Sequence, residues 1–196
     1  MHCQGWPQIA DGGRDISSRR SFKILIDAIT YIAPMTTQCR APEFESQIAL
    51  YAAGAAILRK AVNGVAPQEL STRIAPGTWS IQEVIVHMID SDLAATHRMR
   101  RIAAEEMPLL VSYDEDAFIA RLAAEKTDIA EALALFDTNR TFTARWLGTL
   151  DSPAFARVGI HTQRGKVTLG EILAIYTHHL THHMVFIDGK RKALGV

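Results

Sequence analysis

The chain has 196 residues, which is enough for one domain with a substantial hydrophobic core. Its 21 basic and 21 acidic side chains cancel, so no net charge attracts nucleic acid or an anionic membrane, and small molecules are the expected partners. The longest apolar run, over residues 48–58, is shorter than the about 20 residues that a membrane-spanning helix needs. Cys3 and Cys39 form neither a disulfide framework nor a CxxC motif, which favours a cytoplasmic protein.

The first 42 residues mix glycine, proline and scattered charges and show no sustained helical period. This pattern predicts a poorly ordered N-terminal extension over residues 1–42 and a single domain over residues 43–196. Met35 resembles an ordinary start just ahead of the first regular helix pattern, so one interpretation is that residues 1–34 do not belong to the natural protein. Peptides from this region in the natural protein, found by mass spectrometry, would contradict that interpretation.

Two long helices are predicted in the first half of the domain. From Phe44 to Asn63, apolar residues recur at alternating spacings of four and three, and Gly64 ends the pattern. Ser80 and Glu83 have the spacing of a capping box, in which each residue caps the backbone of the other. This motif predicts the start of a second long helix, which runs to about residue 105.

Helix stop and start signals divide the second half of the domain into a short helix, a long helix, a loop or short hairpin, and a final helix. In chain order these signals are Pro108 at the end of the second helix, Ala124 at the end of the short helix, a long amphipathic pattern over residues 127–150, the loop glycines Gly159 and Gly165, the Thr168–Glu171 capping box, and Gly189 at the end of the last helix. Four long helices rich in alanine and leucine predict an all-α protein with an antiparallel four-helix bundle.

Four of the eight histidines lie within six positions of the last predicted helix. Residues four apart share a helix face, so His179 and His183 form one pair, and His178 and His182 form an equivalent pair rotated by about 100°. Spacing alone does not choose between the pairs. A third imidazole, from His87 on the second helix, would complete a face of three nitrogens that leaves coordination positions open for water or substrate. Zinc or nickel suits such a site, as do iron or manganese with added oxygen ligands.

Less specific interpretations apply to the same residue type. The cluster could instead form a pH-responsive surface or subunit contact, because histidine titrates near neutral pH. His97 and His161 are interpreted as ordinary core or exposed residues.

The helix of His87 carries two further candidates, Asp90 and Arg98, which lie three and eleven positions after it and near the same face. The histidine cluster contains no general base of its own, so Asp90 is predicted to act as a base or to orient a ligand histidine. Arg98 is predicted to anchor an anion or a carboxylate. The structural alternative for both residues is an internal ion pair, which for Arg98 would involve one of the acids at 114–116.

Several segments resemble the YfiT-like branch of the DinB superfamily over roughly residues 44–192. They are GTWSIQEVIVHMIDSD, RMRR, SYDEDAF and IYTHHLTHHMVFI. The resemblance implies an antiparallel four-helix bundle, frequently a homodimer, in which His87, His179 and His183 hold a divalent metal, often zinc or nickel. His182 then takes the place of an intervening histidine, and His178 has no counterpart.

The same resemblance implies two activities. Members of the branch were first described as metal-dependent hydrolases, and characterised relatives resemble S-transferases that activate a low-molecular-weight thiol such as bacillithiol or mycothiol. Phe186 departs from the pattern, because relatives often have a polar residue there. The resulting hypothesis is a metal-dependent enzyme that transfers a thiol to an electrophilic small molecule. The alternatives are a metal-dependent hydrolase and a non-catalytic, stress-associated metal-binding protein.

Overall fold

The structure is a computed structural model that describes residues 39–196. The interpretation of residues 1–34, and nearly all of the predicted extension, lie outside the described residues. The last residue assigned to that extension, Pro42, already begins the first helix of the bundle.

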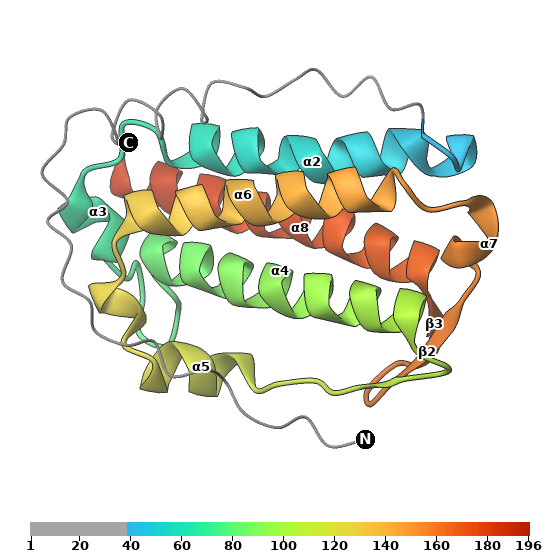
Figure 1. Ribbon diagram of the computed structural model, residues 1–196. Helices are drawn as coiled ribbons and strands as arrows, with labels where there is room; N and C mark the ends of the chain where they lie inside the picture. The colour runs from blue at the N-terminus through green and yellow to red at the C-terminus, as the bar shows by residue number, and fades with distance from the viewer. Residues whose placement is uncertain (1–38) are drawn as a thin grey trace, which may run out of the picture. The chain divides into compact units, whose positions relative to one another are not determined.

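Four long helices form the body of the described part. They are α2 (Pro42–Val62), α4 (Ile81–Ala104), α6 (Ile129–Leu147) and α8 (Leu169–Leu194). Both α2 and α4 pack against α6 and against α8, as Figure 1 shows. The structure therefore confirms the predicted all-α four-helix bundle. None of the described helices is long and apolar enough to cross a bilayer.

The helix directions differ from a simple up-and-down bundle. In Figure 1, α2 and α8 run one way and α4 and α6 run the other. The neighbours α2/α6 and α4/α8 are therefore antiparallel, as predicted, whereas α2/α8 and α4/α6 are parallel. Two long connections cause this arrangement. One, with the short helix α3 (Pro67–Ser71), joins α2 to α4. The other, with α5 (Glu115–Arg121) and the 3-10 turn Ala124–Lys126, returns along α4, so that α6 starts at the same end.

Both predicted capping boxes are present. The Ser80 hydroxyl accepts a hydrogen bond from the Glu83 backbone N–H at 3.1 Å, and the Glu83 carboxylate accepts one from the Ser80 N–H at 2.7 Å. Thr168 and Glu171 make the same exchange. The predicted stop at Gly189 is wrong, because α8 continues to Leu194 and ends at Gly195 in the left-handed conformation. A glycine inside a helix costs only about 1 kcal/mol, which the packing of the last turns outweighs.

A small sheet closes one end of the bundle. The predicted hairpin is formed by β2 (Val158–His161) and β3 (Gly165–Thr168), after the short helix α7 (Ser152–Phe155). An unpredicted strand, β1 (Leu109–Leu110), pairs in parallel with β2. Gly159 lies where a side chain would clash, because a Cβ there would be 2.9 Å from Leu110 Cδ1. The sheet therefore holds the segment after α4 close to the bundle.

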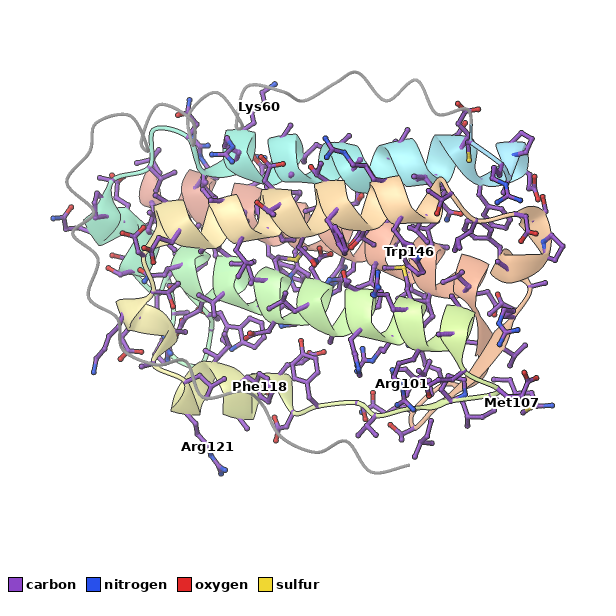
Figure 2. All side chains as sticks on the ribbon, in the orientation of Figure 1. Lys60, Arg101, Met107, Phe118, Arg121 and Trp146 are labelled. Atoms are coloured by element: carbon purple, nitrogen blue, oxygen red, sulfur yellow. The ribbon has the colours of Figure 1, made fainter. Side chains whose placement is uncertain are left out.

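The core has two apolar clusters, and a buried ion pair contacts both. Figure 2 shows side chains filling the space between the helices, while Lys60 and Arg121 point outward. Asp92 of α4 and Arg140 of α6 are almost completely buried and 2.9 Å apart. The Arg140 guanidinium lies over the rings of Tyr51, in one cluster, and Phe136, in the other. This pair ties α4 to α6 through the middle of the bundle.

Candidate metal centre

Three histidines meet between α4 and α8. His87 comes from α4, and His179 and His183 lie one turn apart on α8. The Nε2 atom of His179 is 3.2 Å from that of His87 and 3.0 Å from that of His183. The candidate ligand atoms of all three residues lie within 4.8 Å of one another. Of the two pairs that helical spacing left open, the structure brings His179 and His183 to His87.

The other two histidines of the cluster, His178 and His182, lie away from this meeting point. They are about 100° around the helix from the inward pair, as an α-helix requires. His178 and His182 are both exposed, whereas His87 is buried. The cluster is therefore split between an inward pair and an outward pair.

Aromatic rings hold the three imidazoles in place. Trp79, one residue before the cap of α4, lies with its ring centroid 5.0 Å from that of His87. Tyr176 makes an edge-to-face contact with His179, with 5.9 Å between centroids. Because His87 is only 2 % exposed, its ring has little room to turn away from the α8 pair. The side chains are therefore oriented before any ligand arrives.

Burial keeps all three rings uncharged at neutral pH. It lowers the pKa of His87 to about 4, and the nearby Asp116 carboxylate opposes this shift. Burial and the neighbouring rings of His183 and His87 lower the pKa of His179 to about 3. Burial, with His87 and His182, lowers that of His183 to about 4. Neutral imidazole is the form that binds metal ions.

The spacing of the ring nitrogens fits a divalent ion. Two ligand nitrogens on a tetrahedral zinc ion are about 3.4 Å apart, given Zn–N distances of about 2.1 Å. The two Nε2 separations are close to that value. Within residues 39–196, Nδ1 of His183 is buried without a hydrogen-bond partner. A ring that binds metal through Nε2 carries its proton on Nδ1, so the three rings can offer lone pairs to one point.

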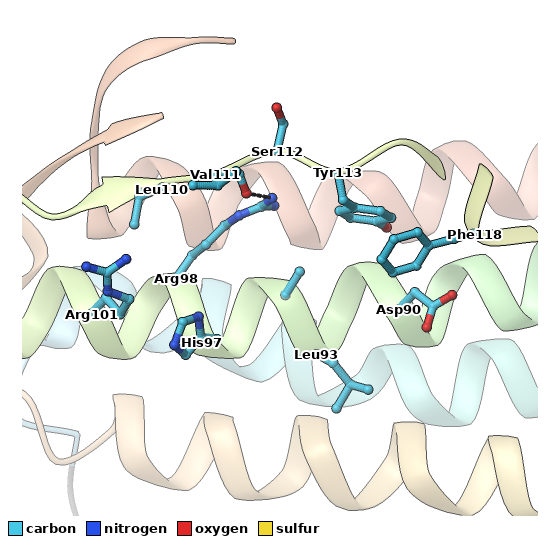
Figure 3. A pocket seen from close by; sticks show the side chains of 11 residues that line it. Asp90, Leu93, His97, Arg98, Arg101, Leu110, Val111, Ser112, Tyr113 and Phe118 are labelled. Atoms are coloured by element: carbon cyan, nitrogen blue, oxygen red, sulfur yellow. Dashed lines mark hydrogen bonds between the residues drawn. The ribbon is translucent and has the colours of Figure 1, made fainter. Parts of the chain in front are cut away.

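Asp90, the predicted base, lies apart from this point. It lines a cavity of about 490 Å³ between α4 and residues 110–118, which we call the Asp90 cavity. Figure 3 shows Asp90 beside Phe118 at one end of this cavity and Arg101 at the other. Burial raises the pKa of Asp90. No hydrogen bond joins Asp90 to the three histidines in the described part of the chain, and its role stays a prediction.

Arg98 is buried and bonded only to neutral groups. It donates hydrogen bonds to the Tyr176 hydroxyl and, at 2.7 Å, to the Val111 carbonyl, the dashed contact in Figure 3. None of the ion pairs among residues 39–196 includes Arg98, so the ion pair considered with the acids at 114–116 is not formed. Arg98 lines the Asp90 cavity and also a smaller pocket that reaches His179.

Two openings lead to the histidines. The smaller, of about 90 Å³, is the polar pocket lined by both Arg98 and His179, which we call the His179 pocket. The larger, of about 360 Å³, is lined by His183 and by the apolar side chains of Trp79, Val84 and Phe186; we call it the His183 cavity. Different molecules can therefore approach the three rings from two sides.

Comparison with known protein families assigns the chain to one of them. The profile of the DinB superfamily matches residues 50–187, which is more than half of the chain. The chain belongs to the DinB superfamily.

Several DinB relatives are similar over most of their length. A protein of Bacillus licheniformis, provisionally named a metal-dependent hydrolase, is 29 % identical over 71 % of this chain and 80 % of its own. YfiT of Bacillus subtilis, provisionally named in the same way, is 28 % identical over 70 % of this chain and 78 % of its own. With such relatives and the three-histidine cluster, the findings support a metal-dependent DinB-type protein that uses a divalent ion.

Two solved structures share the fold. The structure of YfiT from Bacillus subtilis, described as having an unusual four-helix bundle topology, has a TM-score of 0.74 and 25 % identity over 83 % of this chain and 93 % of its own. A mycothiol-dependent maleylpyruvate isomerase has a TM-score of 0.59 and 17 % identity over 72 % of this chain and 59 % of its own, which shows a likeness of fold.

Three residues near the three histidines were not predicted as site residues from the sequence. Tyr176 contacts both His179 and Arg98. His161, interpreted as an ordinary residue, is buried in β2 and lines the His179 pocket. Asp116 lines the His183 cavity. The spacing of Tyr176 three residues before His179 was a usable signal. The other two residues lie in segments that reach the site only through long-range folding.

Proposed function

We propose that this DinB protein binds a divalent metal through His87, His179 and His183 and transfers a low-molecular-weight thiol to an electrophilic small molecule. The observation that carries the proposal is the convergence of three neutral imidazole Nε2 atoms between two openings. Zinc and nickel are the first choices, since both accept three imidazoles, and iron or manganese would need added oxygen ligands.

The ion, when bound, supplies one kind of chemistry, which is to lower the pKa of a thiol or a water at neutral pH. The chain supplies the rest. His87, His179 and His183 would fix the position of the reacting sulfur, and the rings of Trp79 and Phe186 present apolar surface to the substrate in the His183 cavity. The sulfur then forms a bond to the electrophilic carbon as the leaving group departs with the bonding electrons.

The proton of the thiol needs an acceptor. Asp116 lines the same cavity as His183, and its charge acts on the pKa of His87, so we assign it this role. Asp90, the base expected from the sequence, stays the alternative acceptor. The nucleophile comes from outside the protein, because no cysteine of the described chain lines the site, and Ser91 is hydrogen-bonded to Tyr113 at 2.7 Å.

Two alternatives share the metal site. A hydrolase would activate water in place of the thiol, and the provisional names of the Bacillus relatives favour it. A non-catalytic, stress-associated protein would keep the ion without turnover. The mycothiol-dependent isomerase supports thiol chemistry only as a protein of the same fold.

The test is an assay of the metal-loaded protein with monochlorobimane and a panel of small thiols, run beside ester and amide substrates. Thiol-dependent conjugation is expected, and it should disappear in His87→Ala and persist in His178→Ala. Ester or amide cleavage without any thiol would assign the protein as a hydrolase. Metal binding with no turnover in either panel would favour the non-catalytic alternative.

A further inference from the structure

Arg98 is a buried cation without an acidic partner among residues 39–196. Arg98 is 6 % exposed, and its side chain donates hydrogen bonds to one hydroxyl and one carbonyl. Three of its five N–H groups therefore have no acceptor among residues 39–196. A buried charge is costly unless it is paired, so a guanidinium with spare donors beside a cavity favours an anionic ligand. Arg140 in the same bundle shows the contrast, because Asp92 pairs with it at 2.9 Å.

The His179 pocket adds a second positive group to Arg98. Arg164, in the loop between β2 and β3, also lines it, and its side chain makes no ion pair in the described part of the chain. One acid, Glu115, lines the pocket as well, so the formal balance of its charged side chains is positive by one. The two arginines also act on His161. Burial is the main cause that lowers the pKa of its ring, and the charges of Arg98 and Arg164 lower it further.

Hydrogen-bond donors accompany these charges. Nδ1 of His161 accepts a hydrogen bond from the Gln163 backbone N–H at 3.2 Å, so the neutral ring carries its own proton on Nε2. The Tyr176 hydroxyl, held by Arg98, lines the same pocket. The guanidinium, the imidazole and the hydroxyl are all suited to carboxylate oxygens.

Size limits the ligand to a small group. At about 90 Å³ the pocket is well below the roughly 300–1,000 Å³ of sites for drug-sized ligands, so it admits an end group and not a whole molecule. His179 lies in its wall. On the other side of the histidines, the larger His183 cavity is lined by Asp116 and Lys190 as well as by apolar side chains, and these apolar side chains suit an apolar electrophile. The polar pocket is thus left for the polar end of the thiol, whose sulfur would lie at the three histidines, between this pocket and the His183 cavity with Asp116.

We propose that the His179 pocket binds a carboxylate of the thiol substrate, with Arg98 as the principal contact and Arg164 as a second, so that the thiol sulfur lies at the three histidines. This inference rests on the proposed function, because it assumes that a thiol reaches that point. It selects thiols that carry a carboxylate over neutral thiols of the same size. A purely structural Arg98 would hold Val111 and Tyr176 and give no such selection.

The experiment compares 3-mercaptopropionate with its neutral amide on the cobalt(II)-loaded full chain. The dissociation constant of each is taken from the sulfur-to-cobalt absorption band and, independently, from calorimetry on loaded and metal-free protein. We expect the acid to bind at least about tenfold more tightly, which corresponds to about 1.4 kcal/mol. The preference should fall to within about twofold in Arg98→Gln and to an intermediate value in Arg164→Gln. The control Arg100→Gln, which changes an exposed arginine on the same helix, should keep it.

Two results would overturn the inference. They are equal affinity of the original protein for acid and amide, and a preference that both Arg98→Gln and Arg164→Gln leave unchanged. Because Arg164 is exposed, its variant remains informative if Arg98→Gln fails to fold. Failure of the proposed function would give a different result. Cobalt binding would then be the same with and without His87, while calorimetry would still show the Arg98-dependent preference for the acid over the amide.

Discussion

His87, His179 and His183 are neutral in the folded protein and protonated in the acidified unfolded chain, which makes the stability of the metal-free protein depend on pH. Their pKa values are lowered to about 4, 3 and 4 from an unfolded value near 6.5. Between these limits the unfolded chain binds more protons, so the free energy of unfolding should fall as the pH drops from about 6.5 towards 4. Above pH 6.5 these groups add no pH dependence.

Urea denaturation of metal-free protein at pH 7, 6 and 5 measures this effect. The matched variant His87→Gln removes one of the three groups and should lose less stability over the same pH range. A parallel loss in the two proteins would mean that His87 is not held neutral by its burial.

Some residues of the site could be predicted from the sequence and others could not. The α8 histidines could be found because their spacing of four is a local property of a helix. The choice between the two pairs could not be made from spacing, because it depends on which face α8 turns towards His87. His161 and Asp116 come near the site only when the hairpin and the segment after α4 fold back, and no local pattern encodes that contact.

At the scale of elements, the buried Asp92–Arg140 pair should contribute far more to stability than an exposed pair of similar type. Asp92→Ala leaves the Arg140 charge unpaired in the interior and should lower the free energy of unfolding by about 3–5 kcal/mol. The control is Asp137→Ala, since Asp137 pairs with Arg59 at 3.4 Å with both side chains about half exposed, and it should cost about 0–1 kcal/mol. Denaturation of both variants decides this, and equal losses would contradict the expected difference.

Two helix glycines should respond to alanine with opposite signs. Gly189 lies inside α8 with open space where a Cβ would be added, so Gly189→Ala should stabilise the protein by about 0.5–1 kcal/mol. At Gly54 of α2 a Cβ would overlap the Arg140 guanidinium and lie 2.7 Å from Leu180 Cδ2. Gly54→Ala should therefore destabilise by about 1–3 kcal/mol. Thermal denaturation tests both, and stabilisation by Gly54→Ala would show that the contact is absent.

Helix starts were more predictable than helix ends. The two capping boxes are local hydrogen-bond exchanges, and the sequence motif and the structure agree at Ser80 and at Thr168. The end of α8 depends on packing of its last turns, so a lone Gly189 misled the prediction. Strand β1 has only two residues and exists because β2 lies beside it, which no period of the sequence indicates.

For the whole molecule, composition and helical periods were sufficient to predict an all-α four-helix bundle. They did not show which helices pack side by side or in which direction each helix runs. The amphipathic faces show that four helices share a core, whereas the two long connections decide which helices run parallel. The antiparallel contact of α4 with α8 is the one that the site needs. It brings the first turns of α4, with His87, to the middle of α8, with His179 and His183.

The most direct test of the three-histidine site is the metal content of protein made without an affinity tag. We expect about one divalent ion per chain in the original protein and in His182→Ala, and nearly none in His183→Ala. The two variants remove neighbouring histidines of the same helix, one exposed and one at the meeting point of the three rings. Full occupancy in His183→Ala together with loss of metal in His182→Ala would contradict the assignment of the site.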